Sequence, residues 1–205
     1  MKVLIVDDHA VMREGVRRLL SAIPGIEFLE ATTAADALAQ FRKHSPHVTI
    51  LDVNLEGSSG IELLQRLRNE SKTARIVMFT MHSEQSYALR AVRAGAMGYV
   101  SKSAPLDELL VAVKRVAAGE RYLDRNLARD LAFSPAAADD PFSKLSNREI
   151  EILRLLGEGK SLSQIAATFG IAYKTVANSC SRLKTKLGLE RTTDLIRVSL
   201  ESRNR

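Results

Sequence analysis

The chain has 205 residues, of which 45% are hydrophobic, so one or two domains with buried cores are expected. Its single cysteine, Cys180, excludes an internal disulfide framework, and the absence of any apolar run long enough for a signal peptide or a membrane span predicts a cytoplasmic protein. The net charge of +6 arises entirely from Ser143 onward, where 12 Lys and Arg residues outnumber 6 Asp and Glu residues, so the first two thirds of the chain carry no excess charge.

Four short apolar runs, each followed by a helical pattern, predict parallel strands that are buried on both faces of a sheet. The runs end at Asp7 and Asp8, at Asp52, at Thr80 and at Lys102. They are the first, third, fourth and fifth strands of a predicted five-stranded, doubly wound α/β sheet. Because ligands of such sheets bind beyond the carboxyl ends of the strands, these side chains are expected at one edge.

The residue types at this edge suit phosphoryl transfer. Mg²⁺ prefers carboxylate oxygens and keeps phosphate oxygens and waters as further ligands, so Asp7, Asp8 and Asp52 suit a Mg²⁺ site. A carboxylate can also attack phosphorus to give an aspartyl phosphate. The transferring group then needs positive charge and hydrogen-bond donors, which Lys102 and Thr80 supply. Each residue alone is an ordinary loop residue or helix cap, whereas the whole set in this order favours a phosphoryl-transfer site.

Residues 1–120 resemble the receiver domain of a two-component response regulator, which has a flavodoxin-like fold. The resemblance implies the following roles: Asp52 as phosphoacceptor, Asp7, Asp8, Asp52 and the backbone carbonyl of Asn54 as metal ligands, and Thr80, Lys102 and Tyr99 as phosphoryl-stabilising and switch residues. It also implies a sensor histidine kinase as the phosphate donor. One position departs from the family, because Glu56 stands where a proline is usual. An extra carboxylate beside the acceptor is expected to change the phosphorylation rate.

A linker is predicted after the fifth helix of the first domain, which starts near Pro105 and stops near Gly119. A short helix is predicted at residues 126–133. Residues 134–141 contain two prolines and no apolar periodicity, which predicts a tether. The predicted organisation is therefore a first domain at 1–120, a linker at 121–142 and a second domain at 143–205.

The second domain is predicted to be all-α, with four helices. Ser146 followed by Glu149 predicts a capping box at the first helix start, and the glycines at 157 and 159 end that helix. A short helix at 161–169, a turn at Gly170 and a third helix from Ile171 to about Lys186 follow. Two helices joined by a short glycine-containing turn predict a helix-turn-helix, whose second helix enters the major groove of DNA.

The third helix of this domain has separate faces. Val176, Cys180, Leu183 and Leu187 recur at helical spacing and are expected in the core. The opposite and flanking residues are expected to meet base edges or phosphates of double-stranded DNA, in keeping with the positive charge. The expected DNA-contacting residues are Lys174, Thr175, Ala177, Asn178, Ser181, Arg182, Lys184 and Lys186.

Residues 143–202 resemble the LuxR-type helix-turn-helix domain, and the whole chain resembles the NarL/FixJ class of response regulators. The matching residues are Leu145 to Leu156, Gln164 to Ala167, Lys174 to Val176, Asn178, Lys186 to Gly188 and Arg191 to Leu195. The resemblance implies promoter DNA as partner and a homodimer on DNA or on phosphorylation. Ala177, Ser179 and Cys180 depart from the common pattern, so the family's base contacts do not transfer.

Two other functions fit parts of this pattern. A Mg²⁺-dependent phosphohydrolase with an aspartyl-phosphate intermediate would need a second Asp two residues after Asp52 as general acid, and Asn54 stands there. A DNA-binding regulator with a degenerate receiver, independent of phosphorylation, is kept open by Glu56. We predict a phosphorylation-controlled transcription regulator and not an enzyme.

Three further features are interpreted as structural. Cys180 lies on the apolar stripe and is expected to be a buried, inert thiol. The four histidines, His9, His44, His47 and His82, lie in different elements without the spacing of zinc ligands. Residues 57–60 lack the Lys-Ser/Thr end of a phosphate-binding loop and are predicted to form a pliable loop.

Overall fold

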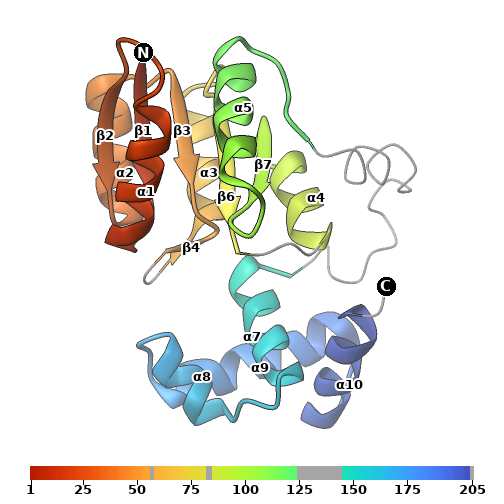
Figure 1. The fold of residues 1–205 in the computed structure, drawn as a ribbon. Coiled ribbons are helices and arrows are strands. Elements are labelled where there is room, and N and C mark those ends of the chain that lie inside the picture. Colours follow the sequence, from red (N-terminus) through yellow and green to blue (C-terminus); the bar gives the residue numbers. More distant parts are fainter. Residues whose placement is uncertain (56–57, 82–84, 124–144, 204–205) are drawn as a thin grey trace. The chain divides into compact units, whose positions relative to one another are not determined.

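The fold is seen in a computed structural model of the chain, which describes residues 1–55, 58–81, 85–123 and 145–203 (Figure 1). The chain divides into two compact units, residues 1–133 and 134–205. Glu56, His82 and the helix predicted at residues 126–133 lie outside the described residues. Among the residues that the structure does describe, no helix is both long and apolar enough to cross a membrane.

A five-stranded parallel sheet lies at the centre of the first unit and confirms the predicted doubly wound α/β fold. Its strands are β1 (Lys2–Val6), β2 (Glu27–Ala31), β3 (Val48–Leu51), β6 (Ile76–Thr80) and β7 (Gly98–Ser101). They lie in the order β2-β1-β3-β6-β7. The strand order therefore reverses direction between β1 and β3, the kind of place where open α/β sheets bind ligands.

Helices cover both faces of this sheet, with α1 and α5 on one face and α2, α3 and α4 on the other (Figure 1). Their bounds are α1 (Ala10–Leu20), α2 (Ala34–His44), α3 (Gly60–Glu70), α4 (Gln85–Arg93) and α5 (Leu106–Ala117). Val3 and Ile5 of β1 pack in one core cluster with Val16 of α1 and Val113 of α5. Because side chains of a strand alternate, the fully buried Leu4 points to the other face. Burial on both faces explains why the central strands β1, β3 and β6 are nearly continuous apolar runs, whereas the edge strand β2 contains two glutamates and is only partly buried.

The segment after Asp52 is more regular than the pliable loop predicted at residues 57–60, and for the described residues 58–60 that prediction is wrong. Asn54–Leu55 (β4) pairs antiparallel with Ser58–Ser59 (β5). Gly60 then donates a backbone hydrogen bond to the carbonyl of Val53 at 2.7 Å. Strands of two residues leave no period in the sequence, so the Gly and Ser content indicated only a turn.

The first unit continues past α5. This helix starts near Pro105, as predicted, with Pro105 as its N-cap, and Gly119 lies just past its end with a φ of 90°. Tyr122 donates from its backbone N–H to Met97 O at 2.8 Å, and its carbonyl accepts from Tyr99 N at 3.2 Å. Tyr122 thus lies along the edge of β7, beyond the domain end predicted at residue 120.

The described part of the second unit has four helices, as predicted. They are α7 (Asn147–Gly157), α8 (Leu162–Thr168), α9 (Tyr173–Leu187) and α10 (Thr192–Arg203). The predicted capping box is present at the start of α7, where Ser146 and Glu149 exchange side-chain to backbone hydrogen bonds. A second capping box, formed by Ser161 and Gln164, starts α8 and was not predicted.

The layout of α8 and α9 confirms the predicted helix-turn-helix. Gly170 lies in the turn with a φ of 61°, and Gly188 follows α9 with a φ of 66°, in a region that glycine adopts without strain. The core of this unit joins residues from all four helices, including Ile152, Ile165, Val176 and Leu195. This core holds α9 in place and so decides which side of α9 is exposed.

Candidate functional site

The carboxyl ends of four parallel strands bring polar residues to one edge of the sheet. Asp7 follows β1, Asp52 follows β3, Thr80 ends β6 and Lys102 follows β7. Two backbone hydrogen bonds tie the strand ends together, from Asp52 N to Val6 O at 3.0 Å and from Lys102 N to Thr80 O at 2.7 Å. The strand order thus places at one edge residues that lie up to 95 positions apart in the sequence.

An ammonium group lies between two buried carboxylates at this edge. Lys102 Nζ donates to Asp7 Oδ2 at 2.7 Å and to Asp52 Oδ2 at 2.6 Å, and no side chain of the three is more than 6% exposed. Burial raises the pKa of Asp52, and the neighbouring Asp7 carboxylate adds to this against the lowering effect of Lys102. Burial opposes the charge on Lys102, but its hydrogen bonds to Asp52 and Asp7 outweigh burial and raise the pKa of Lys102 overall. Lys102 therefore carries its positive charge beside Asp52 at neutral pH.

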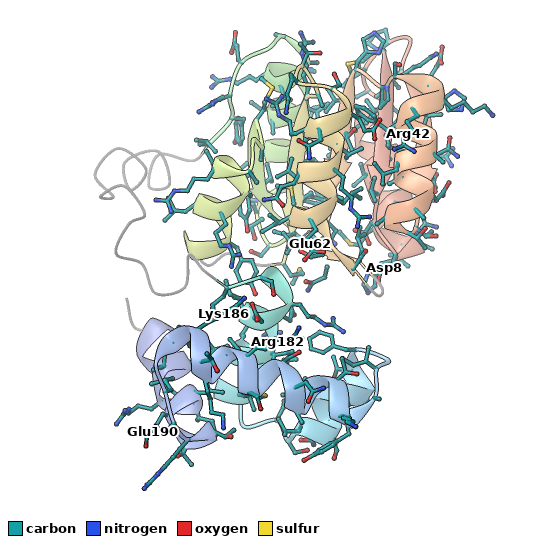
Figure 2. All side chains as sticks on the ribbon, turned by 180° about the vertical axis from the view of Figure 1, so that it is seen from behind. Asp8, Arg42, Glu62, Arg182, Lys186 and Glu190 are labelled. Carbon is teal, nitrogen blue, oxygen red and sulfur yellow. The ribbon has the colours of Figure 1, made fainter. Side chains whose placement is uncertain are left out.

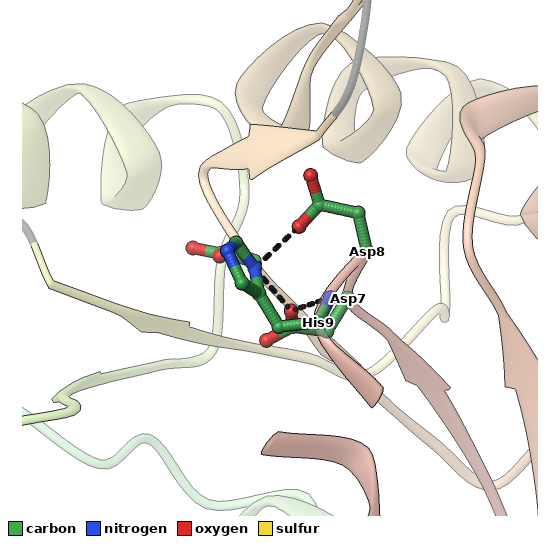
Figure 3. Close-up of side chains that lie close together, drawn as sticks. Asp7, Asp8 and His9 are labelled. Atoms are coloured by element: carbon green, nitrogen blue, oxygen red, sulfur yellow. Dashed lines mark hydrogen bonds and ion pairs between the residues drawn. The ribbon is translucent and has the colours of Figure 1, made fainter. Parts of the chain in front are cut away.

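The loop between β1 and α1 adds a histidine to the acidic residues (Figure 3). His9 Nδ1 lies 2.7 Å from Asp8 Oδ1 and 3.2 Å from Asp7 Oδ1, and His9 N donates to Asp7 Oδ1 at 2.8 Å. Potential ligand atoms of Asp7, Asp8, His9 and Asp52 all lie within 4.8 Å of one another. His9 therefore lies beside the acidic cluster, although the four histidines as a set lack the spacing of zinc ligands. The available signal was its place directly after two acids, not a ligand spacing.

This cluster suits a divalent cation. Carboxylate oxygens are the ligands that Mg²⁺ prefers, and the Oδ1 atom of Asp52 is buried without a hydrogen-bond partner among the described residues. Most buried polar atoms in proteins have a partner, so this oxygen is open to a ligand. Asn54, whose backbone carbonyl is a predicted ligand, lies at the start of β4 shortly after Asp52.

The two predicted switch residues lie on neighbouring strands and are buried. Thr80 ends β6 with no exposed surface, and Tyr99 of β7 is 6% exposed. Tyr99 pairs with Met78 in the parallel register. Because residues two apart on a strand share a face, Thr80 and Tyr99 point to the same side of the sheet. Their neighbours Phe79 and Val100 belong to the core under α1 and α5, so Thr80 and Tyr99 face the α3 and α4 side.

Gly60 is in close contact with the backbone of Asp52. A Cβ atom at position 60 would lie 1.8 Å from the Asp52 carbonyl oxygen and 2.8 Å from its carbonyl carbon. The first residue of α3 therefore has room for hydrogen alone. This residue was not among the predicted site residues, because a lone sequence does not distinguish a glycine of close approach from a loop glycine.

Helix α9 of the second unit has one buried side and one exposed side. Val176, Cys180 and Leu183 are buried as predicted, and Leu187 is partly buried against the same cluster. Burial raises the pKa of the Cys180 thiol, in keeping with an inert side chain. Ser179 is also buried, which was not predicted, and its hydroxyl donates to Thr175 O at 3.0 Å.

The predicted DNA-contacting residues divide by exposure. Lys174, Thr175, Asn178, Ser181, Arg182 and Lys186 are exposed, and Ala177 and Lys184 are partly buried. Thr175, Asn178, Ser181 and Arg182 line a shallow hollow on the helix surface. The side chains of Arg182 and Lys186 project from α9 (Figure 2). The exposed side is therefore polar and basic, which suits a polyanion.

Lys186 has a contact that the sequence did not reveal. Its Nζ donates to Glu149 Oε2 at 2.7 Å, and the Glu149 side chain is 6% exposed. Burial would raise the pKa of Glu149, but the hydrogen bonds from Lys186 and Ser146 lower it overall. Lys186 thus joins the end of α9 to the start of α7. A substitution of Lys186 would therefore affect folding as well as DNA binding.

Comparison with known proteins identifies the family. Residues 3–114 match the response regulator receiver domain, and residues 143–199 match the bacterial regulatory proteins of the luxR family. The chain therefore belongs to the two-component response regulators of the NarL/FixJ class, a family of DNA-binding transcription regulators.

Two relatives match nearly the whole chain, and one solved structure matches about two thirds of it. The response regulator UvrY of Escherichia coli (strain K12) is 31% identical over 98% of this chain and 94% of that protein. The DNA-binding transcriptional activator DevR/DosR of Mycobacterium tuberculosis is 41% identical over 94% of this chain and 91% of that protein. The crystal structure of a LuxR-family two-component response regulator from Aurantimonas sp. SI85-9A1 has a TM-score of 0.60 and 39% identity, covering 64% of this chain and 94% of that one.

Proposed function

We propose that this chain binds promoter DNA under the control of phosphorylation at Asp52. The observation that carries the proposal is the pairing of Lys102 with Asp7 and Asp52, beside an Asp52 oxygen without a hydrogen-bond partner among the described residues. This arrangement puts a nucleophilic oxygen next to a fixed positive charge and a set of metal ligands.

The acidic residues would hold the cation. Asp7, Asp8, Asp52 and the backbone carbonyl of Asn54 are the proposed Mg²⁺ ligands, with His9 directly beside the first two. When bound, Mg²⁺ supplies positive charge to the phosphoryl oxygens. Asp7 and Asp8 would keep this positive charge close to Asp52. The charge would reduce the repulsion between the negative Asp52 carboxylate and the negative phosphoryl group.

The phosphate comes from a phosphohistidine of a partner sensor histidine kinase. An oxygen of Asp52 attacks phosphorus, the new O–P bond forms as the P–N bond to the kinase imidazole breaks, and the imidazole leaves after taking a proton from solvent. Lys102 passes from the two carboxylates to the phosphoryl oxygens, and the Thr80 hydroxyl donates a hydrogen bond to them. The chain is thus a phosphoryl acceptor and not an enzyme for outside phosphoesters, because Asn54 offers no general acid.

The signal leaves the site through buried residues. Thr80 and Tyr99 face the same side of the sheet, so a shift of Thr80 toward the phosphoryl group leaves space that Tyr99 can occupy. The surface of α4, β7 and α5 then changes. This change shifts a pre-existing equilibrium toward a form whose second unit dimerises on DNA.

The second unit binds DNA through α9. Its exposed polar residues Asn178 and Ser181, with Thr175 and Ala177, would meet base edges, and the basic residues Lys174, Arg182, Lys184 and Lys186 would meet phosphates. The name of the 41% identical relative, a DNA-binding transcriptional activator, supports this role. A promoter-binding protein of this kind works in the bacterial cytoplasm, where the DNA is.

A small-molecule phosphodonor with Mg²⁺ is expected to phosphorylate Asp52 of the full chain. The product should be stable in acid and labile in alkali, because it is an acyl phosphate. Mass spectrometry of the intact chain and of its peptides measures the added phosphoryl group and its place. Labelling of Asp52→Asn to the native level, or labelling that is independent of Mg²⁺, would contradict the assignment.

Asn178→Ala and Lys184→Ala are expected to weaken DNA binding in different ways. A bidentate contact of Asn178 with an adenine is worth about 1–3 kcal/mol. Its loss should therefore lower the affinity for target DNA and leave the affinity for random DNA unchanged. Lys184→Ala should instead lower the affinity for target and random DNA alike. It should also reduce the slope of log affinity against log salt concentration by about one unit. Lys184 is the better phosphate probe, because Lys186 is also paired with Glu149. Affinities for both DNAs, measured as a function of salt concentration, test these expectations. An equal loss of affinity for target and random DNA in Asn178→Ala would exclude base readout by Asn178.

A further inference from the structure

The backbone of Asp7 is held on both sides by atoms outside the acidic cluster. Its N–H donates to Ala31 O of β2 at 3.2 Å. Its carbonyl accepts from Arg13 Nη1 at 2.9 Å. Asp7 is a buried proposed ligand whose carboxylate contacts Lys102, so the position of its peptide groups decides where the acidic pair lies.

Arg13 is itself fixed by a second partner. Its Nε donates to Glu30 Oε2 at 2.9 Å, and the Arg13 side chain is 15% exposed. The other oxygen of Glu30 accepts from Arg17 Nη1 at 3.2 Å. The backbone N–H of Arg13 also donates to His9 O at 3.2 Å. Arg13 thus contacts the loop at two carbonyls and is oriented from behind by Glu30.

Arg18 of the same helix also pairs with a glutamate, but its setting is different. Arg18 pairs with Glu14 one turn away, and the two side chains are 81% and 54% exposed. Exposed pairs of this kind contribute little to stability because solvent screens them. Arg13 instead donates to the backbone of a proposed metal ligand, which makes its geometry relevant to the site.

We propose that Arg13, oriented by Glu30, is a positioning residue that holds the Asp7–Asp8 loop in the conformation that binds the divalent cation. This inference rests on the proposed Mg²⁺ site. Hydrogen bonds outside the ligand shell orient metal ligands, and their loss typically lowers metal affinity by about 10- to 100-fold. The planar guanidinium reaches Asp7 O and Glu30 at once through two nitrogens, which the single ammonium of lysine does not reproduce.

A positioning role and a mere charge effect predict opposite results. The Arg13 guanidinium places a positive charge near the acidic cluster, which by itself repels a cation. If only this charge mattered, Arg13→Gln would bind Mg²⁺ more tightly and Arg13→Lys would match the native chain. If Arg13 positions the loop, both substitutions weaken Mg²⁺ binding despite their different charges.

The test is the dissociation constant for Mg²⁺ of the unphosphorylated full chain, measured by isothermal titration calorimetry. Arg13→Gln and Arg13→Lys are expected to raise it by about tenfold or more, and Glu30→Gln to raise it less. Arg18→Gln, a loss of the same charge on the same helix, is the matched control and should leave it unchanged. Hydrogen exchange of β1 and β3 without Mg²⁺ verifies that each variant is folded.

Native-like or tighter Mg²⁺ binding by Arg13→Gln would overturn the positioning role. Native Mg²⁺ affinity in both single variants, Glu30→Gln and Arg13→Lys, would also overturn it. Failure of the native chain to bind Mg²⁺ is a different result, because it would overturn the proposed metal site and the inference with it.

Discussion

Lys102→Met should destabilise the first unit by about 3–5 kcal/mol at neutral pH without Mg²⁺. Lys102 Nζ is the positive partner of Asp7 and Asp52, and both carboxylates are buried. Removing one partner of a buried ion pair leaves uncompensated charge, at a cost of about that size. Hydrogen exchange of β1 and β3 as a function of urea measures the free energy of unfolding of this unit in the full chain.

The control is Lys114→Met, which removes an exposed lysine of α5 and should change stability by no more than about 0.5 kcal/mol. The loss in Lys102→Met should shrink as the pH falls. Burial raises the pKa of Asp52, so as the pH falls the folded chain takes up this proton before the unfolded chain does. Protonation of Asp52 removes its repulsion with the Asp7 carboxylate. Mg²⁺ should also recover part of the loss. Equal stability of the two variants at neutral pH would show that Lys102 is not the counter-charge.

Gly60→Ala should destabilise the first unit by about 3 kcal/mol or more, at the upper end of the cost of overpacking. The new Cβ would lie 1.8 Å from the Asp52 carbonyl oxygen and 2.9 Å from Val53 Cα, and backbone atoms have little room to move. Either α3 or the acceptor must shift, so phosphorylation of Asp52 by the small-molecule donor should also slow. The same urea-dependent hydrogen exchange measures the stability.

Gly15→Ala is the matched control, because nothing lies within 4 Å of a Cβ built at this position of α1. Alanine is favoured over glycine inside a helix, so this variant should gain about 0.5–1 kcal/mol. If both alanine variants gain stability, the close approach of Gly60 to Asp52 is wrong.

The main elements could be predicted because local patterns encode them. Buried parallel strands are continuous apolar runs, and Asp52, Thr80 and Lys102 come directly after or at the end of such runs. The start of α7 is encoded by Ser146 and Glu149, which are three residues apart. The family resemblance added the roles of Asn54 and Tyr99, which no local pattern indicates.

The remaining features depend either on contacts between distant residues or on local backbone geometry. Lys186 and Glu149 are 37 positions apart, so their pairing leaves no periodicity to detect. Arg13 meets Glu30 across 17 positions for the same reason. The pairing of β4 with β5 and the approach of Gly60 to Asp52 depend on backbone geometry that glycine and serine permit but do not specify.

The central claim is that phosphorylation of Asp52 controls DNA binding. Its most direct test selects bound fragments of the source genome with the full chain, and then measures the dissociation constant for the best fragment with and without phosphodonor and Mg²⁺. The native chain should bind the fragment about 5- to 150-fold more tightly after phosphorylation, the usual range of allosteric coupling, and Asp52→Asn should show no change. Equal affinity of the native chain in both states, with the phosphoryl group on Asp52 verified by mass, would contradict the claim and leave a DNA-binding protein that does not depend on its receiver.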